Sequence, residues 1–303
     1  MSFEDSMIDE GFSDEQDYLD YLLDEEEERF EHSREEEQVD YREDPYFSEV
    51  QRKNTYLWFV ENLVLNNVTE VGENAYRHCS GLTRITISRS VNKIGANAFE
   101  GCTGLTDIVI PESVREIEDN AFEDCTGLTN IVIPSSVTKI GKNAFEGCTG
   151  LTNIVIPESV TEIDDGAFSN CTSLTSIEIP DGVTKIGQGA FKSCTGLTSV
   201  TVSDNNPFLA SENNCCLSKD KRTLIFGCKT SVIPNNVAYI NRGAFSACTG
   251  LKSIAIPDNV SEIDDGTFKG CTGLTRIEIP SSVTKIGKNA FEGCLADARR
   301  LQA

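Results

Sequence analysis

Apolar residues recur through most of this chain in a fixed order that repeats every 23 positions. The clearest copy spans residues 128–150 and reads LTNIVIPSSVTKIGKNAFEGCTG. Leu128, Ile131 and Ile133 predict the inner face of a short strand, and Val132 between two of them points outward. Pro134 ends this strand, because it has no N–H to donate to a neighbouring strand.

The second half of each copy predicts another short strand and a return. Val137 and Ile140 belong to that strand, Gly141 turns the chain, and Phe145 and Cys148 fill the return. One copy cannot enclose a core alone, but stacked copies share one. Parallel strands of successive copies would then lie about 4.8 Å apart. The pattern predicts a mainly β solenoid of parallel strands.

Two residue types mark the period most clearly and set the bounds of the solenoid at residues 68–294. The first copy, 68–79, is degenerate. The cysteines at this spacing are Cys79, Cys102, Cys125, Cys148, Cys171, Cys194, Cys248, Cys271 and Cys294. The phenylalanines are Phe99, Phe122, Phe145, Phe168, Phe191, Phe245, Phe268 and Phe291.

One insertion breaks the period. Cys194 and Cys248 are separated by two periods and eight additional residues, and the extra chain falls within 203–227. Residues 218–221, Ser-Lys-Asp-Lys, lie between two apolar stretches and predict the turn of a β-hairpin.

The two ends of the chain do not follow the repeat. Residues 1–50 contain 21 Asp or Glu and 3 Arg, a balance of −18, whereas the whole chain has a net charge of −23. We expect a disordered acidic arm with a short helix at about 14–31; the alternative is an arm that binds a basic protein. Residues 51–67 predict a helical cap, and 295–303 a C-terminal tail or cap.

Charge and composition exclude several classes of protein. A strongly acidic chain is unsuited to nucleic acid or to an anionic membrane surface. No apolar run is long enough to insert into a membrane. The first residues show no export signal, and twelve cysteines then suggest reduced thiols and a cytoplasmic location.

The repeat resembles the BspA-like leucine-rich-repeat family, in its 23-residue class. The family pattern L-x-x-I-x-I-P-x-x-V-x-x-I-G-x-x-A-F-x-x-C is met from Leu151 to Cys171, with Asp164 in place of the glycine. The resemblance covers about residues 60–294. It implies a right-handed solenoid that binds proteins without catalysis, often on bacterial or protist surfaces. A surface adhesin is therefore the alternative function, and the cell surface or secretion the alternative location.

The cysteines and histidines do not predict catalysis, a metal or a cofactor. Zinc sites need four converging ligands, often in Cys-x₂₋₄-Cys pairs, whereas a spacing of 23 makes a line of buried thiols. Cys215, Cys216 and Cys228 are interpreted as hairpin core, with a redox or metal role as the alternative. His78 next to Cys79 would be exposed, which disfavours a nucleophile pair.

Charges alternate at one position of the second strand. The position reads Glu70, Lys93, Glu116, Lys139, Glu162 and Lys185 in successive copies. Stacked opposite charges would penalise a slip of one coil, so the column is interpreted as a control of register. The alternative is a charged docking face.

The outward positions of the first strand are the candidate partner-binding site. Three valines in a row form an apolar stripe, which can mark a contact with another protein. The alternative is only that valine favours strands. The candidate residues are Asp107, Val109, Asn130, Val132, Asn153 and Val155. The function predicted from them is non-catalytic binding of a protein partner.

Overall fold

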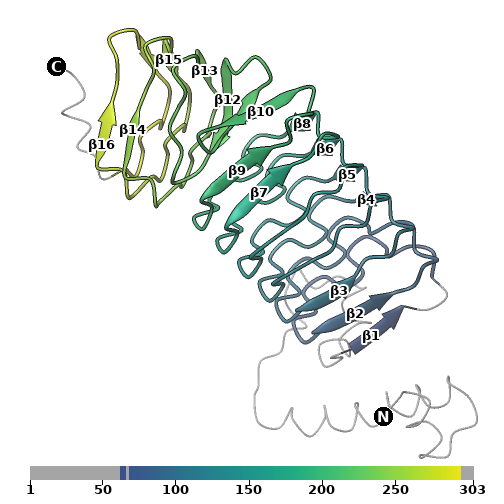
Figure 1. The fold of residues 1–303 in the computed structure, drawn as a ribbon. Coiled ribbons are helices and arrows are strands. Elements are labelled where there is room, and N and C mark those ends of the chain that lie inside the picture. Colours follow the sequence, from purple (N-terminus) through teal and green to yellow (C-terminus); the bar gives the residue numbers. More distant parts are fainter. Residues whose placement is uncertain (1–61, 66–67, 295–303) are drawn as a thin grey trace, which may run out of the picture. The chain divides into compact units, whose positions relative to one another are not determined.

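A computed structural model describes residues 62–65 and 68–294. In this part of the chain short strands recur in successive coils, and the coils stack on one another (Figure 1). The prediction of a mainly β solenoid with parallel strands is confirmed. No helix occurs within the described residues. The acidic arm and the C-terminal segment lie outside them.

Each coil contributes up to two strands, and like strands of successive coils pair in parallel. The first strands are β1 (Asn62–Leu65), β2 (Arg84–Ile87), β3 (Asp107–Val109), β7 (Ser176–Ile179), β9 (Ser199–Val202), β14 (Ser253–Ala255) and β16 (Arg276–Glu278). The second strands are β4 (Glu116–Ile117), β5 (Lys139–Ile140), β6 (Glu162–Ile163), β8 (Lys185–Ile186), β13 (Tyr239–Ile240), β15 (Glu262–Ile263) and β17 (Lys285–Ile286).

Strand β1 corrects part of the sequence prediction. The helical cap was expected to include Asn62 and Leu63, but Asn62–Leu65 is a strand that pairs in parallel with β2. Val64 points outward and Leu65 is buried, so the segment has the alternation of a first strand. The stack of strands therefore begins before residue 68. The remainder of the predicted cap, 51–61 and 66–67, lies outside the described residues.

The predicted hairpin is present and forms the edge of a small mixed sheet. Strands β10 (Leu209–Glu212), β11 (Cys215–Ser218) and β12 (Thr223–Gly227) are antiparallel, and β12 then pairs in parallel with β13. Cys215 and Cys216 are fully buried, as expected for hairpin core.

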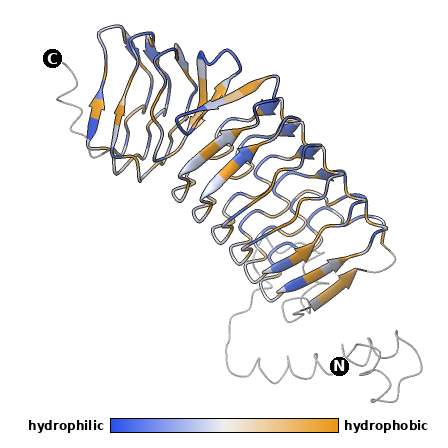
Figure 2. Cartoon of the chain, in the orientation of Figure 1, coloured by the Kyte–Doolittle hydropathy of each residue, from blue (hydrophilic) through white to orange (hydrophobic). Residues whose placement is uncertain are grey.

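The core consists of columns of identical side chains, one per coil. Leu128, Ile131 and Ile133 are buried, and hydropathy alternates along the strands accordingly (Figure 2). The Phe122 and Phe145 rings stack with centroids 5.3 Å apart and planes within 5°. Since regular coils present the same surface to one another, the unit repeats without a change in packing outside the insertion.

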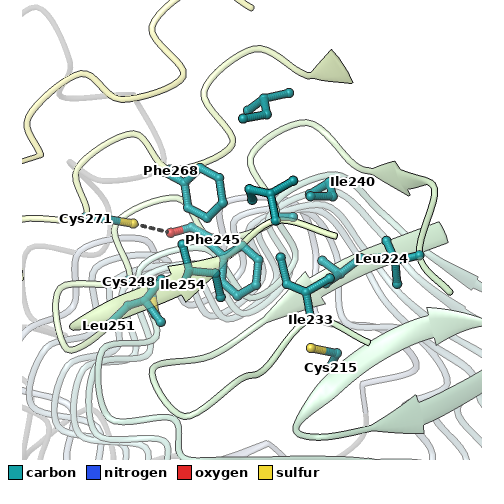
Figure 3. Packing of buried hydrophobic residues seen from close by; sticks show 14 of the residues in the cluster. Cys215, Leu224, Ile233, Ile240, Phe245, Cys248, Leu251, Ile254, Phe268 and Cys271 are labelled. Atoms are coloured by element: carbon teal, nitrogen blue, oxygen red, sulfur yellow. Dashed lines mark hydrogen bonds between the residues drawn. The ribbon is translucent and has the colours of Figure 1, made fainter. Parts of the chain in front are cut away.

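The cysteine column has a hydrogen bond that the sequence does not reveal. Cys148 Sγ donates to the carbonyl oxygen of Phe122 at 3.2 Å. Cys271 makes the equivalent bond to Phe245 at 3.0 Å (Figure 3). Seven thiols of the column, from Cys102 to Cys194 and at Cys271 and Cys294, thus donate to a backbone carbonyl of a preceding coil while the sulfur fills the apolar core.

Candidate interaction surface

The three predicted valines form a contiguous exposed column. Val109, Val132 and Val155 are 62%, 69% and 70% exposed. Bridges join Val109 to Val132 and Val132 to Val155 in parallel register, so these side chains are neighbours on adjacent coils. Their neighbours along the chain point into the core, which leaves the valines no partner within the coil.

Polar residues flank the valine column on the same face. Asp107, Asn130 and Asn153 are exposed two positions earlier in each coil. Asp107 pairs with Arg84 of the preceding coil, with a distance of 3.1 Å between Arg84 Nε and Asp107 Oδ2. The face therefore combines an apolar stripe with a polar edge. The structure places all six predicted residues on this one surface.

Sequence reasoning missed Val64, which extends the same column. Val64 is 57% exposed and is aligned with Thr86, which is aligned in turn with Val109. The sequence feature that could have revealed Val64 is the alternation in Asn-Leu-Val-Leu, which we interpreted as the end of a helix. We call the exposed column Val64, Thr86, Val109, Val132 and Val155 the valine face.

The charge columns largely neutralise themselves. Lys185 pairs with Glu162 of the preceding coil, and Lys285 pairs with Glu262 in the same way. Lys139 instead contacts Asp164 at 3.3 Å, on the following coil. Each of these exposed pairs contributes little to stability, and control of register by the alternating column stays a prediction.

The thiols lie in an environment that suppresses nucleophilic chemistry. Within residues 62–65 and 68–294, all twelve cysteines are free and no group of His, Cys, Asp and Glu could hold a metal ion. Burial raises the pKa of Cys79 to about 11 and that of Cys194 to about 12. His78 is half-exposed and has φ of 61°, at a turn position that glycine occupies in other coils. These thiols remain protonated at neutral pH.

Three stacked glutamates form an electrostatic feature that sequence reasoning also missed. Glu100, Glu123 and Glu146 each follow the buried phenylalanine of their coil. Burial, and then the carboxylates of Glu100 and Glu146, raise the pKa of Glu123 to about 7. Arg77 binds the end of the column through Glu100 at 2.6 Å. The sequence feature that could have revealed this stack is the recurrence of Glu at the same position in three successive repeats.

The repeat matches a known family along most of its length. Six copies of the BspA type leucine rich repeat region match, over residues 56–172, 115–227 and 225–296. The chain belongs to the BspA-type leucine-rich-repeat family. The resemblance noted from the sequence is thereby confirmed. A search of curated proteins finds no match.

Two solved structures are similar to this chain. A leucine rich cell surface protein from Faecalibacterium prausnitzii is 32% identical, with a TM-score of 0.63 over 78% of this chain and 71% of that protein. The pneumococcal vaccine antigen PcpA is 23% identical, with a TM-score of 0.67 over 77% and 70% of the two chains, and shares the fold. Within the residues described here, no helix is long and apolar enough to cross a membrane.

Proposed function

We propose that this leucine-rich-repeat protein is a non-catalytic binding module that holds a protein partner on the valine face. The observation behind the proposal is the unbroken exposed column of Val109, Val132 and Val155. The charge columns offer a partner little net field, because their lysines form ion pairs with carboxylates of adjacent coils. Apolar contact is then the main source of affinity that the regular coils provide.

The size of the apolar contribution can be bounded. Burial of a whole valine side chain contributes about 1.5–3 kcal/mol, so about two-thirds of that is still available at each exposed valine. Three valines then contribute about 3–6 kcal/mol before the entropy of association is subtracted. Hydrogen bonds from Asn130 and Asn153 supply specificity at the edge of the contact.

The partner of this proposal is a protein with an apolar patch surrounded by basic residues. Residues 1–50 have a balance of −18 and would steer such a partner toward the chain. Steering acts mainly on the association rate and weakens with salt. The valine face would instead determine how long the complex lasts.

A second candidate is an adhesin that acts at the cell surface. It is favoured by the 32% identity to a cell surface protein of the same fold. Both candidates use binding without catalysis, and they differ in location. The cytoplasmic location predicted from the first residues stays a prediction. Antibody labelling of intact cells from the native source distinguishes the two: surface labelling supports the adhesin.

The binding test uses charged substitutions on the valine face. Val132→Glu, alone and with Val109→Glu, should abolish partner capture and leave the fold intact, because Glu178 already occupies this position in β7. Ala255→Glu, at the same repeat position on β14, is the matched control. Captured proteins are compared quantitatively between wild type and variants. A partner that binds the folded double variant as well as the wild type would place the binding surface elsewhere.

A further inference from the structure

The returns of neighbouring coils are normally joined by three backbone hydrogen bonds. In one such pair the N–H groups of Asn143, Phe145 and Gly147 donate to carbonyl oxygens of the following coil, at 3.0, 2.8 and 2.9 Å. The same three bonds recur from Gly166, Phe168 and Asn170 to the next coil. This ladder satisfies backbone groups that would otherwise need water or a ligand.

The ladder is interrupted between the return that contains Gly189 and the return that contains Ala244. Ser193 still donates to the carbonyl oxygen of Ser246 at 3.2 Å. The N–H groups of Gly189 and Phe191, which occupy the other two donor positions, have no acceptor within the described part of the chain. The two coils therefore meet at one end of the return and separate at the other.

The hairpin insertion causes this separation. Phe226 at the end of β12 stacks on Phe191, with ring centroids 4.6 Å apart and planes at 25°. Gly227 takes over the carbonyl oxygen of Ala244 through a bond of 3.0 Å. The end of β12 therefore acts as a wedge between the coils and occupies one side of the gap. The other side stays open.

The open side is a cleft of about 300 Å³. Its apolar walls include Phe191, Phe226 and Phe245, and Lys192 and Arg242 lie at its polar rim. A second hollow of about 300 Å³ shares Lys192 and Arg242. We call the first hollow the coil-gap cleft. Its volume lies at the lower end of the range for small-ligand and short-peptide sites.

The coil-gap cleft and the adjoining hollow carry more basic than acidic side chains: Asp264 lines the cleft and Asp265 the hollow, whereas Lys192 and Arg242 line both. The lysines Lys269 and Lys288 line the adjoining hollow, where Lys269 already pairs with Glu292 at 2.9 Å. Lys192 has no ion pair within the described residues. Arg242 has only a long contact, 3.9 Å, to Asp265. Two cationic side chains at the rim are thus available to a ligand.

A backbone position in the coil-gap cleft also lacks its usual carboxylate. At the position of Arg242, three other coils donate the backbone N–H to an Asp of the preceding coil. The preceding coil here has Gln188 instead, and neither the N–H nor the carbonyl of Arg242 has a partner within the described residues. The complete pairs are Lys142 with Asp119 at 2.8 Å, Gln188 with Asp165 at 2.6 Å, and Lys288 with Asp265 at 2.6 Å.

We propose that the coil-gap cleft binds an acidic peptide segment of a partner protein, which completes the interrupted ladder between the two returns. Its carbonyl oxygens accept from Gly189 and Phe191, as the following coil does elsewhere. Its carboxylate accepts from the Arg242 N–H, in the place of the absent Asp. The side chains of Lys192 and Arg242 bind further carboxylates by charge-assisted hydrogen bonds. Apolar residues of the peptide cover the small exposed parts of Phe191 and Phe226.

The test uses the full chain and a fluorescently labelled eight-residue peptide of alternating Asp and Val, with binding followed by fluorescence anisotropy. We expect saturable binding that weakens at least tenfold with Lys192→Glu or Arg242→Glu. Both side chains are exposed, so the fold should be retained, which circular dichroism checks. Lys142→Glu is the matched control, because Lys142 occupies the repeat position of Arg242 in a regular coil, and it should bind as the wild type does.

Two further probes separate ladder completion from simple charge attraction. An Asn-Val peptide should not bind. An Asp-Val peptide with trans-alkene isosteres in place of its central amide bonds lacks the accepting carbonyl oxygens, and it should bind at least fivefold more weakly. Absence of saturable binding would overturn the proposal. It would also be overturned if the Lys192→Glu and Arg242→Glu variants bound the peptide as tightly as the wild type does. So would an alkene-isostere peptide that binds as tightly as the parent, since only charge attraction would then remain.

Discussion

Replacement of Glu123 by Gln tests whether the stack of three glutamates lowers stability at neutral pH. Glu123 lies between Glu100 and Glu146 on adjacent coils, and its pKa of about 7 is well above the ordinary 4.5. Between these two values the folded chain holds a proton that the unfolded chain has lost. The free energy of unfolding must therefore fall as pH rises from about 4.5 to about 7, and this loss is complete above pH 7.

The magnitude follows from the geometry of the stack. The full pKa shift corresponds to about 3.4 kcal/mol, but Glu123 is only partly buried, and solvent screening reduces this figure. Carboxylates on coils about 4.8 Å apart repel by about 0.9 kcal/mol each in a water-like dielectric. Glu123 has two such neighbours, and Arg77 offsets part of their repulsion. We therefore expect Glu123→Gln to raise the free energy of unfolding by about 1–2 kcal/mol at pH 8.

Urea denaturation followed by circular dichroism at pH 5, 6, 7 and 8 measures this effect. Glu123→Gln should be more stable than the wild type at pH 8, and the difference should shrink toward pH 5. Glu178→Gln is the control, because Glu178 is an exposed strand residue aligned with Thr201 rather than with another carboxylate. The electrostatic reasoning would be refuted if the two proteins had the same free energy of unfolding at pH 8. It would also be refuted if their difference in free energy of unfolding were the same at every pH.

Three further predictions concern the repeated positions. The cysteines should react slowly with a thiol reagent in the native chain, and nearly all twelve should react in denaturant. Detection of disulfides or of stoichiometric zinc would contradict this prediction. Cys148→Ala should lower the free energy of unfolding by about 1–3 kcal/mol, because it removes a thiol hydrogen bond and a buried sulfur, although the Phe122 carbonyl keeps the Cys125 N–H as a donor. Cys148→Ser retains a side-chain donor and should cost less. Ala247→Gly should raise the free energy of unfolding by about 1 kcal/mol, because Ala247 has a strained φ of 55° where several other coils have glycine. Gly270→Ala should lower it by a similar amount. Unchanged thermal melts for both variants would disprove this backbone strain.

The sequence alone determined the repeated architecture. Leu128, Ile131 and Ile133 recur with a period that only stacked coils can bury together, so strands, core columns and the exposed position of Val132 all follow from one spacing. The hairpin at 203–227 was also predicted, because its turn residues separate two apolar stretches. In these regions the local pattern of apolar and polar residues and the packing between coils favour the same backbone conformation.

The tertiary structure decided what depends on contacts between coils. Asn62–Leu65 became a strand because β2 offered an open edge, a choice that its own short pattern left ambiguous. The pKa of Glu123 and the acceptor of each cysteine arise from residues one period away, whose distance only the stacked coils define. The coil-gap cleft depends on where Phe226 enters the phenylalanine stack. An insertion in a sequence shows that a period is broken, but the packing of the inserted chain decides which backbone groups are left without partners.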